Sequence, residues 1–387
     1  MKRFIPGLLL LSACASSAPD FASSKSERAE RREPSVARLR AGETNDNDAF
    51  DDYLRYFKAY PERDVRKIDV TDRSIVTFVD WDGNPIADAP VRFTADGAEV
   101  YRARTTAAGQ VMLPSAALGV RARTIEATVD GKRVSFRRED RSEVTVNLPQ
   151  PERDEIDVDI AFCLDTTGSM GDEIDRIKST MNDVVERLGR LSPRPRLRWG
   201  MVCYRDRGDE YVTKRFQFTT RLADFVDDLD HLRAEAGGDY EEDVNAGLDA
   251  AVNQLDWSRR DAIRVLFLIG DAPPHTDLGT PYVTSMRTAV EKGIKIYTIA
   301  ASGLNDRGEF IWRQLAQFTL AKFMFISYGG STPHHVGGYK ENNLDDLMVR
   351  AVKGELESLR ARPSPRRQQP REYGRGREPD DFREWQK

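Results

Sequence analysis

The sequence of 387 residues predicts an α/β protein, in which a doubly wound domain over residues 151–360 follows an all-β sandwich over residues 70–150. Short runs rich in Val, Thr, Ile and Phe, separated by turn residues, predict the sandwich. Near-continuous apolar strands that alternate with helical patterns over residues 155–358 predict a sheet buried on both faces. The net charge of -5 argues against a nucleic-acid partner, which would usually require a basic domain.

The N-terminal segment over residues 1–13 has the pattern of a secretory signal peptide. Two basic residues precede an apolar run over residues 5–11, which is too short for a membrane-spanning helix of about 20 residues. The run ends in Leu-Ser-Ala before Cys14, which resembles the bacterial lipobox and implies acylation of Cys14 and cleavage before it. By resemblance to enterobacterial sorting, Ala15 at the next position implies the outer membrane. An ordinary signal peptide with a chance cysteine is the alternative.

Residues 14–69 are expected to be a disordered tether with one short helix, and residues 361–387 a disordered basic tail. Residues 15–49 contain few large apolar side chains, so they cannot bury enough surface to fold. Aromatic residues at helical spacing between Phe50 and Tyr60 predict the helix, which would pack on the next domain or bind a partner. The tail is solvated or contacts anionic lipid or polysaccharide.

The segment over residues 70–150 carries about seven short strand patterns, with turns such as Asp96-Gly97 and Asp130-Gly131 between them. The stretch over residues 82–91, followed by that over residues 105–111, resembles the transthyretin-like and bacterial Ig-like modules of secreted proteins. No site chemistry is visible in it. We therefore expect a structural spacer or a domain that contacts other proteins.

The doubly wound domain is expected to alternate strands and helices to its end. Strands are expected over residues 156–164, 198–204, 214–219, 263–269, 294–301 and 323–328. Helices are expected over residues 171–188, 222–234, 242–255, 282–292, 308–318 and 344–360. In such folds ligands bind at the carboxyl ends of the strands.

Oxygen-bearing side chains gather at that edge. Asp165, Thr167 and Ser169 occupy alternate positions between the first strand and the first helix, so an extended turn would aim all three the same way. Asp271 follows the most apolar strand, whose carboxyl end lies at the same edge. Carboxylate and hydroxyl oxygens suit a hard cation such as Mg²⁺. We expect these four residues to bind one divalent cation.

Asp165-x-Thr167-x-Ser169 resembles the D-x-[ST]-x-S metal motif of von Willebrand factor A domains, and Asp271 resembles the distal aspartate of that family. The resemblance covers roughly residues 155–355 and implies a metal-ion-dependent adhesion site, in which the cation accepts a carboxylate from a partner. The family usually supplies a threonine from its middle loop, whereas Asp239 takes that place here. A third carboxylate would hold the cation more firmly, would weaken attraction for an acidic partner, and would favour Ca²⁺ or Mn²⁺. Asp239 could instead only cap the following helix.

Several side chains are candidates for the rim of this site. Asp206, His275, His334 and His335 are all expected near the same sheet edge. Asp206 could lie in a rim loop beside the cation or in a solvated surface loop. The three histidines could form a second metal site or a ligand pocket, or they could only hydrogen-bond the backbone of the loops or the carboxylates of the site. Cys163 and Cys203, each near a strand end, are expected to be buried thiols, because cross-strand neighbours seldom have disulfide geometry.

The sequence thus favours a non-enzymatic, membrane-anchored binding module that engages a protein or a cell-envelope ligand through a divalent cation. The alternative is a metal-assisted hydrolase or an accessory subunit of an envelope enzyme complex. Ser169 does not fit the G-x-S-x-G pattern of a hydrolase nucleophile, because residue 167 is threonine. The set of oxygen ligands also lacks the histidines common in hydrolytic zinc sites.

Overall fold

The computed structural model describes residues 38–61, 65–148, 157–191, 195–277, 279–327, 334–337 and 339–360. All of them belong to one compact unit, Ala37–Lys387. The expected signal peptide, Cys14 and the basic tail lie outside the described residues. None of the helices within the described ranges combines the length and the hydrophobicity that crossing a membrane requires.

The α/β domain contains an eight-stranded sheet in the order β11-β10-β9-β12-β13-β14-β1-β15. Five neighbouring strands run parallel, namely β10 (Arg196–Tyr204), β9 (Asp157–Asp165), β12 (Ala262–Gly270), β13 (Ile294–Ala300) and β14 (Phe323–Ile326). The strand β11 (Thr213–Thr219) closes one side antiparallel to β10. The expected doubly wound architecture is confirmed, with antiparallel strands added at both sides.

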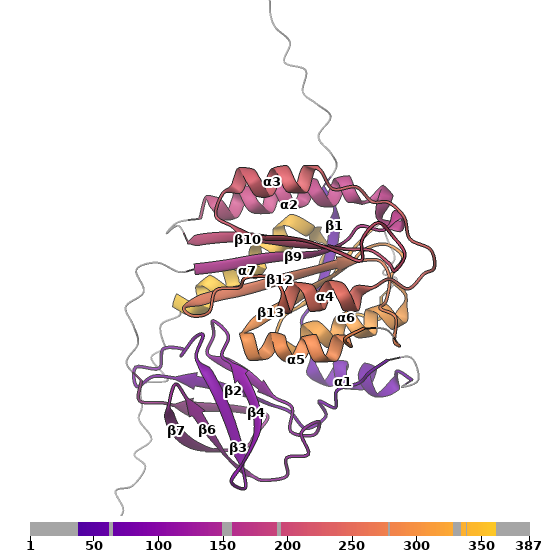
Figure 1. The fold of residues 1–387 in the computed structure, drawn as a ribbon. Coiled ribbons are helices and arrows are strands. Elements are labelled where there is room, and N and C mark those ends of the chain that lie inside the picture. Colours follow the sequence, from indigo (N-terminus) through magenta and orange to yellow (C-terminus); the bar gives the residue numbers. More distant parts are fainter. Residues whose placement is uncertain are drawn as a thin grey trace, which may run out of the picture. The chain divides into compact units, whose positions relative to one another are not determined.

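Helices cover both faces of this sheet (Figure 1). One face packs on α2 (Ile174–Gly189), α3 (Leu222–Asp230) and α7 (Leu344–Arg360), and the other on α4 (Val244–Asn253), α5 (Tyr282–Lys292) and α6 (Asp306–Phe318). Side chains of β9 alternate between the two cores, with Ile160 and Phe162 in the first and Ala161 and Cys163 in the second. This burial on both faces explains why residues 160–164 form an unbroken apolar run.

The other side of the sheet is completed by the N-terminal segment. β1 (Arg40–Thr44) pairs antiparallel with β14, with Ala41 opposite Ile326, and β15 (Asn342–Asn343) pairs with β1. The expectation of a tether without strands is therefore wrong for residues 40–44. The strand was not visible in the sequence because only Leu39 and Ala41 are apolar and buried there, and the pairing uses the backbone.

The expected short helix is confirmed as α1 (Phe50–Ala59). It packs on α6 of the α/β domain, where Phe57 stacks on Phe310 with ring centroids 5.7 Å apart. Arg73, which precedes the β domain, lies over the ring of Phe50. The helix therefore fills the corner where the N-terminal segment turns toward the β domain.

The β domain consists of seven strands within the described residues. They are β2 (Ser74–Val79), β3 (Pro90–Ala95), β4 (Ala98–Arg104), β5 (Gln110–Leu113), β6 (Thr124–Val129), β7 (Lys132–Arg137) and β8 (Arg141–Thr145). They form a sheet β5-β2-β8 and a sheet β4-β3-β6-β7. The two sheets pack on each other, with the ring centroids of Phe78 in the first and Phe93 in the second 6.2 Å apart. The expected all-β domain ahead of the α/β domain is confirmed.

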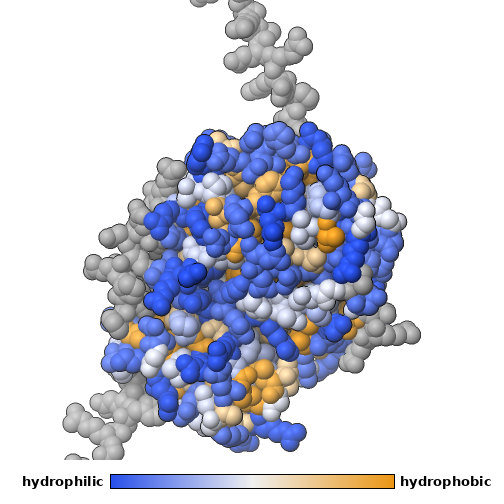
Figure 2. Space-filling view, viewed as in Figure 1, coloured by the Kyte–Doolittle hydropathy of each residue, from blue (hydrophilic) through white to orange (hydrophobic). Residues whose placement is uncertain are grey.

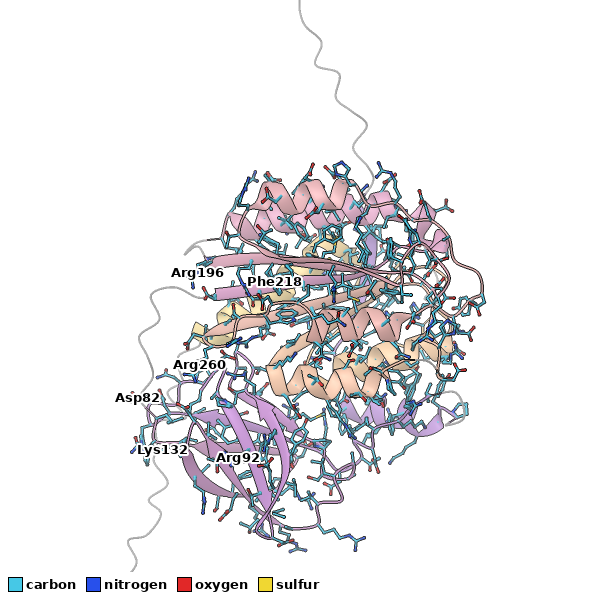
Figure 3. The ribbon with its side chains drawn as sticks, viewed as in Figure 1. Asp82, Arg92, Lys132, Arg196, Phe218 and Arg260 are labelled. Carbon is cyan, nitrogen blue, oxygen red and sulfur yellow. The ribbon has the colours of Figure 1, made fainter. Side chains whose placement is uncertain are left out.

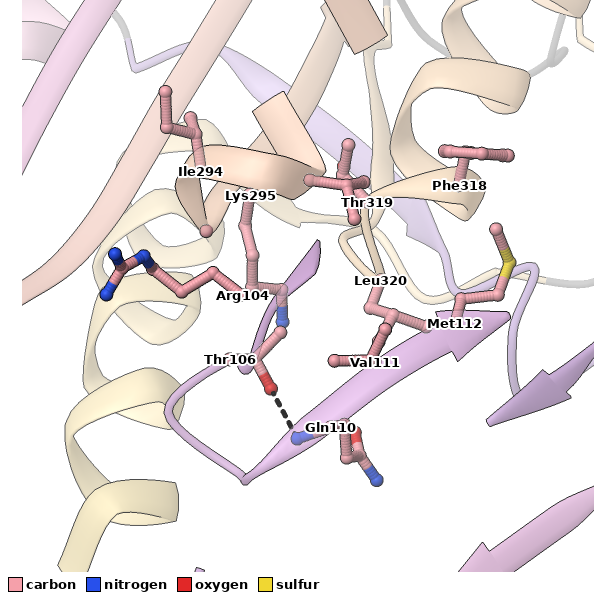
Figure 4. Close-up of a pocket in the computed structure, with 12 residues that line it drawn as sticks. Arg104, Thr106, Gln110, Val111, Met112, Ile294, Lys295, Phe318, Thr319 and Leu320 are labelled. Atoms are coloured by element: carbon pink, nitrogen blue, oxygen red, sulfur yellow. Dashed lines mark hydrogen bonds between the residues drawn. The ribbon is translucent and has the colours of Figure 1, made fainter. Parts of the chain in front are cut away.

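A buried ion pair joins the two domains. The Asp88 carboxylate accepts hydrogen bonds from Arg264 at 2.6 and 3.2 Å and from the Ala262 backbone N–H at 3.1 Å. A small pocket also opens between the domains, where the Gln110 N–H donates to Thr106 (Figure 4). None of the described residues that line this pocket is acidic or a histidine, so it offers no cation site. The molecular face in Figure 2 is largely hydrophilic, with apolar residues in small separate groups.

Candidate metal centre

The site lies at the carboxyl ends of β9 and β12, which are neighbours in the sheet. Asp165 is the last residue of β9, and Asp271 follows directly after β12. Because Leu164 pairs with Ile269, the two aspartates emerge side by side. Figure 3 shows Arg196 at the opposite end of the parallel strands, where β10 begins. The predicted convergence of two strand-end acids follows from this register.

The four residues of the motif form one hydrogen-bonded chain. Asp165 Oδ1 accepts from the backbone N–H of Thr167 at 2.9 Å and from its hydroxyl at 2.7 Å. The hydroxyls of Thr167 and Ser169 are 3.1 Å apart, and Ser169 Oγ donates to Asp271 Oδ1 at 3.1 Å. The short 3-10 helix η1 (Gly168–Asp172) begins within this turn and keeps Ser169 next to Thr167. The structure thus brings Asp165, Thr167, Ser169 and Asp271 together.

Glycines allow the backbone to approach the site closely. A Cβ on Gly168 would lie 2.6 Å from the carbonyl oxygen of Ala236, which the Gly168 N–H contacts at 2.9 Å. A Cβ on Gly270 would lie 3.2 Å from Asp165 Oδ2. The loop that carries Ala236 is therefore held against the motif through the backbone of Gly168.

Glu242 is a further acid at this site, and the sequence pattern alone did not indicate it. A Cβ on Gly237 would lie 3.3 Å from Glu242 Oε1 and 3.5 Å from Thr167 Cβ, and the Glu242 side chain interacts with that of Thr167. Its side chain is buried, with 3 % of the residue exposed, and Oε2 has no hydrogen-bond partner among the described residues. Burial, together with the charges of Asp165 and Asp206, raises the pKa of Glu242 to about 9.

The position of Glu242 explains why it was overlooked. It directly precedes Asp243, whose side chain accepts the Ala246 N–H and caps α4, so the sequence pattern indicated only a helix start. Its backbone N–H donates to the Pro273 carbonyl at 3.2 Å, which ties the loop to the segment after Asp271. The available signal was the four acids among residues 239–243, directly after a Gly-Gly pair.

The donor set fits a divalent cation. Asp165 Oδ2 is buried and accepts no hydrogen bond from the described residues, while the nearby Tyr204 hydroxyl contacts the Ile269 carbonyl at 3.5 Å. Burial and the charge of Asp271 raise the pKa of Asp165 to about 7. Burial also raises the pKa of Asp271. Buried acids that repel one another, with acceptor oxygens left unpaired, are what a bound cation would satisfy.

Asp239 is exposed and lies beside the predicted rim residues. Ligand atoms of Asp206, Asp239 and His275 all lie within 4.8 Å of one another. His275 Nε2 is 2.8 Å from Asp206 Oδ1. The three residues come from three segments at the carboxyl edge of the sheet.

His334 and His335 contact a different group. His334 Nδ1 lies 3.3 Å from Glu309 Oε2 on α6, and the His335 N–H donates to the same carboxylate at 3.0 Å. Arg313 also donates to Glu309, at 3.1 Å. Within the described residues, none of the hydrogen bonds of these two histidines involves the motif at β9.

Cys163 and Cys203 are buried and not bonded to each other, so the predicted pair of thiols is confirmed. Burial raises the pKa of both thiols, that of Cys203 to about 12. Neither sulfur is therefore available as a thiolate ligand at neutral pH.

Comparison with known proteins assigns this part of the chain. Residues 159–321 match the family model of the von Willebrand factor A domain. The protein contains a von Willebrand factor A domain. The match includes all five residues around the site, from Asp165 to Asp271, with Glu242 among them. A domains generally mediate protein–protein interaction and commonly bind a divalent cation.

Two curated proteins are similar to part of this chain. Alpha-protein kinase vwkA of Dictyostelium discoideum is 34% identical over 128 residues, which are 32% of this chain and 19% of the relative. An ariadne-like RING finger protein of Acanthamoeba polyphaga mimivirus is 30% identical over 118 residues, which are 30% of this chain and 11% of that protein. This chain therefore spans less than a fifth of the length of either relative.

Solved structures also resemble the chain, at low similarity. Proximal thread matrix protein 1 from the mussel byssus aligns with a TM-score of 0.37 and 16% identity, covering 53% of this chain and 47% of that one. Its second crystal form aligns with a TM-score of 0.31 and 18% identity, covering 40% and 41%.

Proposed function

We propose that this protein is a membrane-anchored, non-enzymatic binding module whose A domain engages a protein or cell-envelope ligand through a divalent cation. One observation carries the proposal. Two buried carboxylate oxygens, Asp165 Oδ2 and Glu242 Oε2, have no hydrogen-bond partner in the described part of the chain and lie near the hydroxyls that lead to Asp271. An uncompensated buried acceptor is costly, so the site favours a cation over an empty state.

The residues that would hold the cation are Asp165, Thr167, Ser169, Asp271 and Glu242. They offer only oxygen, which favours Mg²⁺, and the extra carboxylate also suits Ca²⁺ or Mn²⁺. Three carboxylates against two positive charges leave a net charge of -1. When bound, the cation supplies a Lewis-acidic position that a ligand oxygen can occupy. The negative balance retains the cation and reduces attraction for an acidic ligand.

The hydroxyl groups of the site support binding over catalysis. The hydrogen bonds of Ser169 Oγ within the described residues involve Thr167 and Asp271. A serine nucleophile requires a base within hydrogen-bond reach, usually a histidine. His275, on the neighbouring loop, contacts Asp206. These contacts support a role of Ser169 as a cation ligand.

The location in the cell follows from the N-terminal sequence. A lipid on Cys14 would anchor the chain in the bacterial envelope, at the outer membrane. Fewer than thirty residues separate Cys14 from β1, which begins at Arg40. We infer that this tether and the β domain hold the binding face of the A domain away from the membrane, with the β domain as a spacer or a second contact surface.

The test is retention of envelope extract on the immobilised full chain, with Mg²⁺ or with EDTA, for the wild type and for Asp165→Ala. We expect specific proteins or envelope components to be retained by the wild type with Mg²⁺ and released by EDTA. Asp165→Ala should lose at least tenfold in retention. A matched control is Asp227→Ala, because this exposed aspartate of α3 lies in the same domain.

Retention that is indifferent both to EDTA and to Asp165→Ala would overturn the proposal. Turnover of an envelope substrate that Asp165→Ala abolishes would replace it with the hydrolase alternative.

A further inference from the structure

We propose that Asp206, Asp239 and His275 form a second metal site, which takes Zn²⁺ and lies on the rim of the first site. The inference goes beyond the proposed function, because ligand binding through the first cation does not require it. An imidazole combined with carboxylates is a typical zinc donor set, whereas the first site offers only oxygen and suits Mg²⁺.

The distances allow a zinc ion without a large rearrangement. The three ligand atoms lie within 4.8 Å of one another, and His275 Nε2 lies 2.8 Å from Asp206 Oδ1. Bonds of about 2.1 Å in a tetrahedral site place the ligand atoms about 3.4 Å apart. Asp239 is exposed and can close this gap, while Asp206 and His275 keep only 12% and 14% of their side chains exposed. One coordination position remains for water or a ligand.

The three segments that carry these residues are fixed by other contacts. The Asp209 carboxylate accepts the Asp206 N–H at 3.1 Å and the Gly237 N–H at 3.3 Å, which ties the first segment to the loop of Asp239. The His275 carbonyl accepts from Asn245 at 2.7 Å, which ties the third segment to α4. These side chains of Asp209 and Asn245 hold the backbone of the three segments in place, which favours a preformed metal site.

Glu242, which also lines the first site, is close enough to Asp206 for their charges to interact. Its Oε2 is buried and has no hydrogen-bond partner among the described residues, and only 3% of the residue is exposed.

The neighbouring arginines do not neutralise the cluster. Arg207 donates to Asp243 at 3.0 Å, where the cap of α4 begins. Arg205 donates to the carbonyls of Thr166 and Arg233, at 3.1 and 3.0 Å. The negative charge of Asp206 and Asp239 is thus left for a cation.

The experiment titrates the full chain with Zn²⁺ alone after removal of all metal, in excess Mg²⁺ that fills the first site. Calorimetry gives the affinity, elemental analysis the stoichiometry, and Co²⁺ absorbance reports a tetrahedral site with a nitrogen ligand. We expect one zinc per chain, with at least tenfold weaker affinity in His275→Ala and in Asp239→Asn. The exposed Asp239 allows a substitution that does not disturb the fold.

Two controls separate the possible outcomes. His231→Ala removes an exposed histidine of the same domain and should leave the zinc affinity unchanged. Asp165→Ala should abolish Mg²⁺ binding but keep the zinc site. Zinc binding that survives both His275→Ala and Asp239→Asn, or that disappears only with Asp165→Ala, overturns the inference. Neither result bears on the proposed function, which depends on Mg²⁺ and Asp165.

Discussion

Asp165→Asn should change the stability of the protein in opposite directions with and without a divalent cation. The substitution removes one negative charge from a fully buried position and keeps an oxygen that can accept both hydrogen bonds of Thr167. In EDTA the variant should be more stable than the wild type at pH 8. With Mg²⁺ it should be less stable, because it no longer binds the cation.

The magnitude follows from the pKa of Asp165. The pKa rises from an ordinary 3.8 to about 7, so the folded state binds more protons than the unfolded state between about pH 4 and 7. Stability without a cation therefore falls as pH rises through this window. At about 1.4 kcal/mol per pH unit the ceiling is about 4 kcal/mol. We expect about 2 kcal/mol, because the neighbouring acids titrate together.

The assay is urea unfolding of the wild type and Asp165→Asn at pH 5 and pH 8, in EDTA and with Mg²⁺. At pH 5 in EDTA the two proteins should differ little, because the wild-type carboxyl is then protonated. Mg²⁺ at 100 times its Kd should stabilise the wild type by about 2.7 kcal/mol at pH 8 and the variant by much less.

Two results would refute this reasoning. One is a wild-type stability in EDTA that is the same at pH 5 and pH 8. The other is an Asp165→Asn variant that is less stable than the wild type in EDTA at pH 8. Either would mean that the buried carboxylate is compensated within the protein and does not require a cation.

Three further substitutions test other parts of the structure. Gly168→Ala places a methyl group 2.6 Å from the Ala236 carbonyl oxygen, so urea unfolding should show a loss of about 1–3 kcal/mol, and calorimetry weaker Mg²⁺ binding; unchanged binding would contradict the close approach. Arg313→Met leaves Asp46 buried without its partner and should cost about 3–5 kcal/mol in the same unfolding assay, whereas a loss below 1 kcal/mol would contradict a buried ion pair. Tyr240→Phe removes the hydroxyl that donates to the Gly303 carbonyl and accepts the Asn305 N–H, and so links the loops of residues 240 and 303. Stopped-flow chelation should then show faster release of the cation, while the free energy of unfolding changes by less than about 1.5 kcal/mol. An unchanged release rate would show that this link does not retain the cation.

The parts of the fold that the sequence predicted are those whose side chains are buried in a regular pattern. Most residues of β9 and β12 are apolar and buried on both faces of the sheet, and α5 was predicted at its observed bounds, Tyr282–Lys292. Regular burial leaves a periodic pattern, which is the strongest signal in a single sequence.

The parts that the sequence did not predict depend on contacts between distant residues. β1 is held by backbone pairing with β14 and by Arg313, which binds Asp46 at 2.8 Å. Glu242 looks like an ordinary acid ahead of a helix until the loop folds over Thr167. The four residues of the motif could be predicted because the carboxyl ends of neighbouring parallel strands lie at one edge of the sheet. The loop that carries Glu242 has no such regular geometry, so its position could not be predicted.

β1 also determines what counts as an independent folding unit. The strand that it covers, Phe323–Ile326, is a run of four large apolar residues that would otherwise expose unpaired backbone groups along its length. Such an edge pairs readily with other chains and leads to aggregation. The segment before the β domain thus acts as a built-in protective strand, and the α/β domain is complete only when residues from both ends of the chain are present.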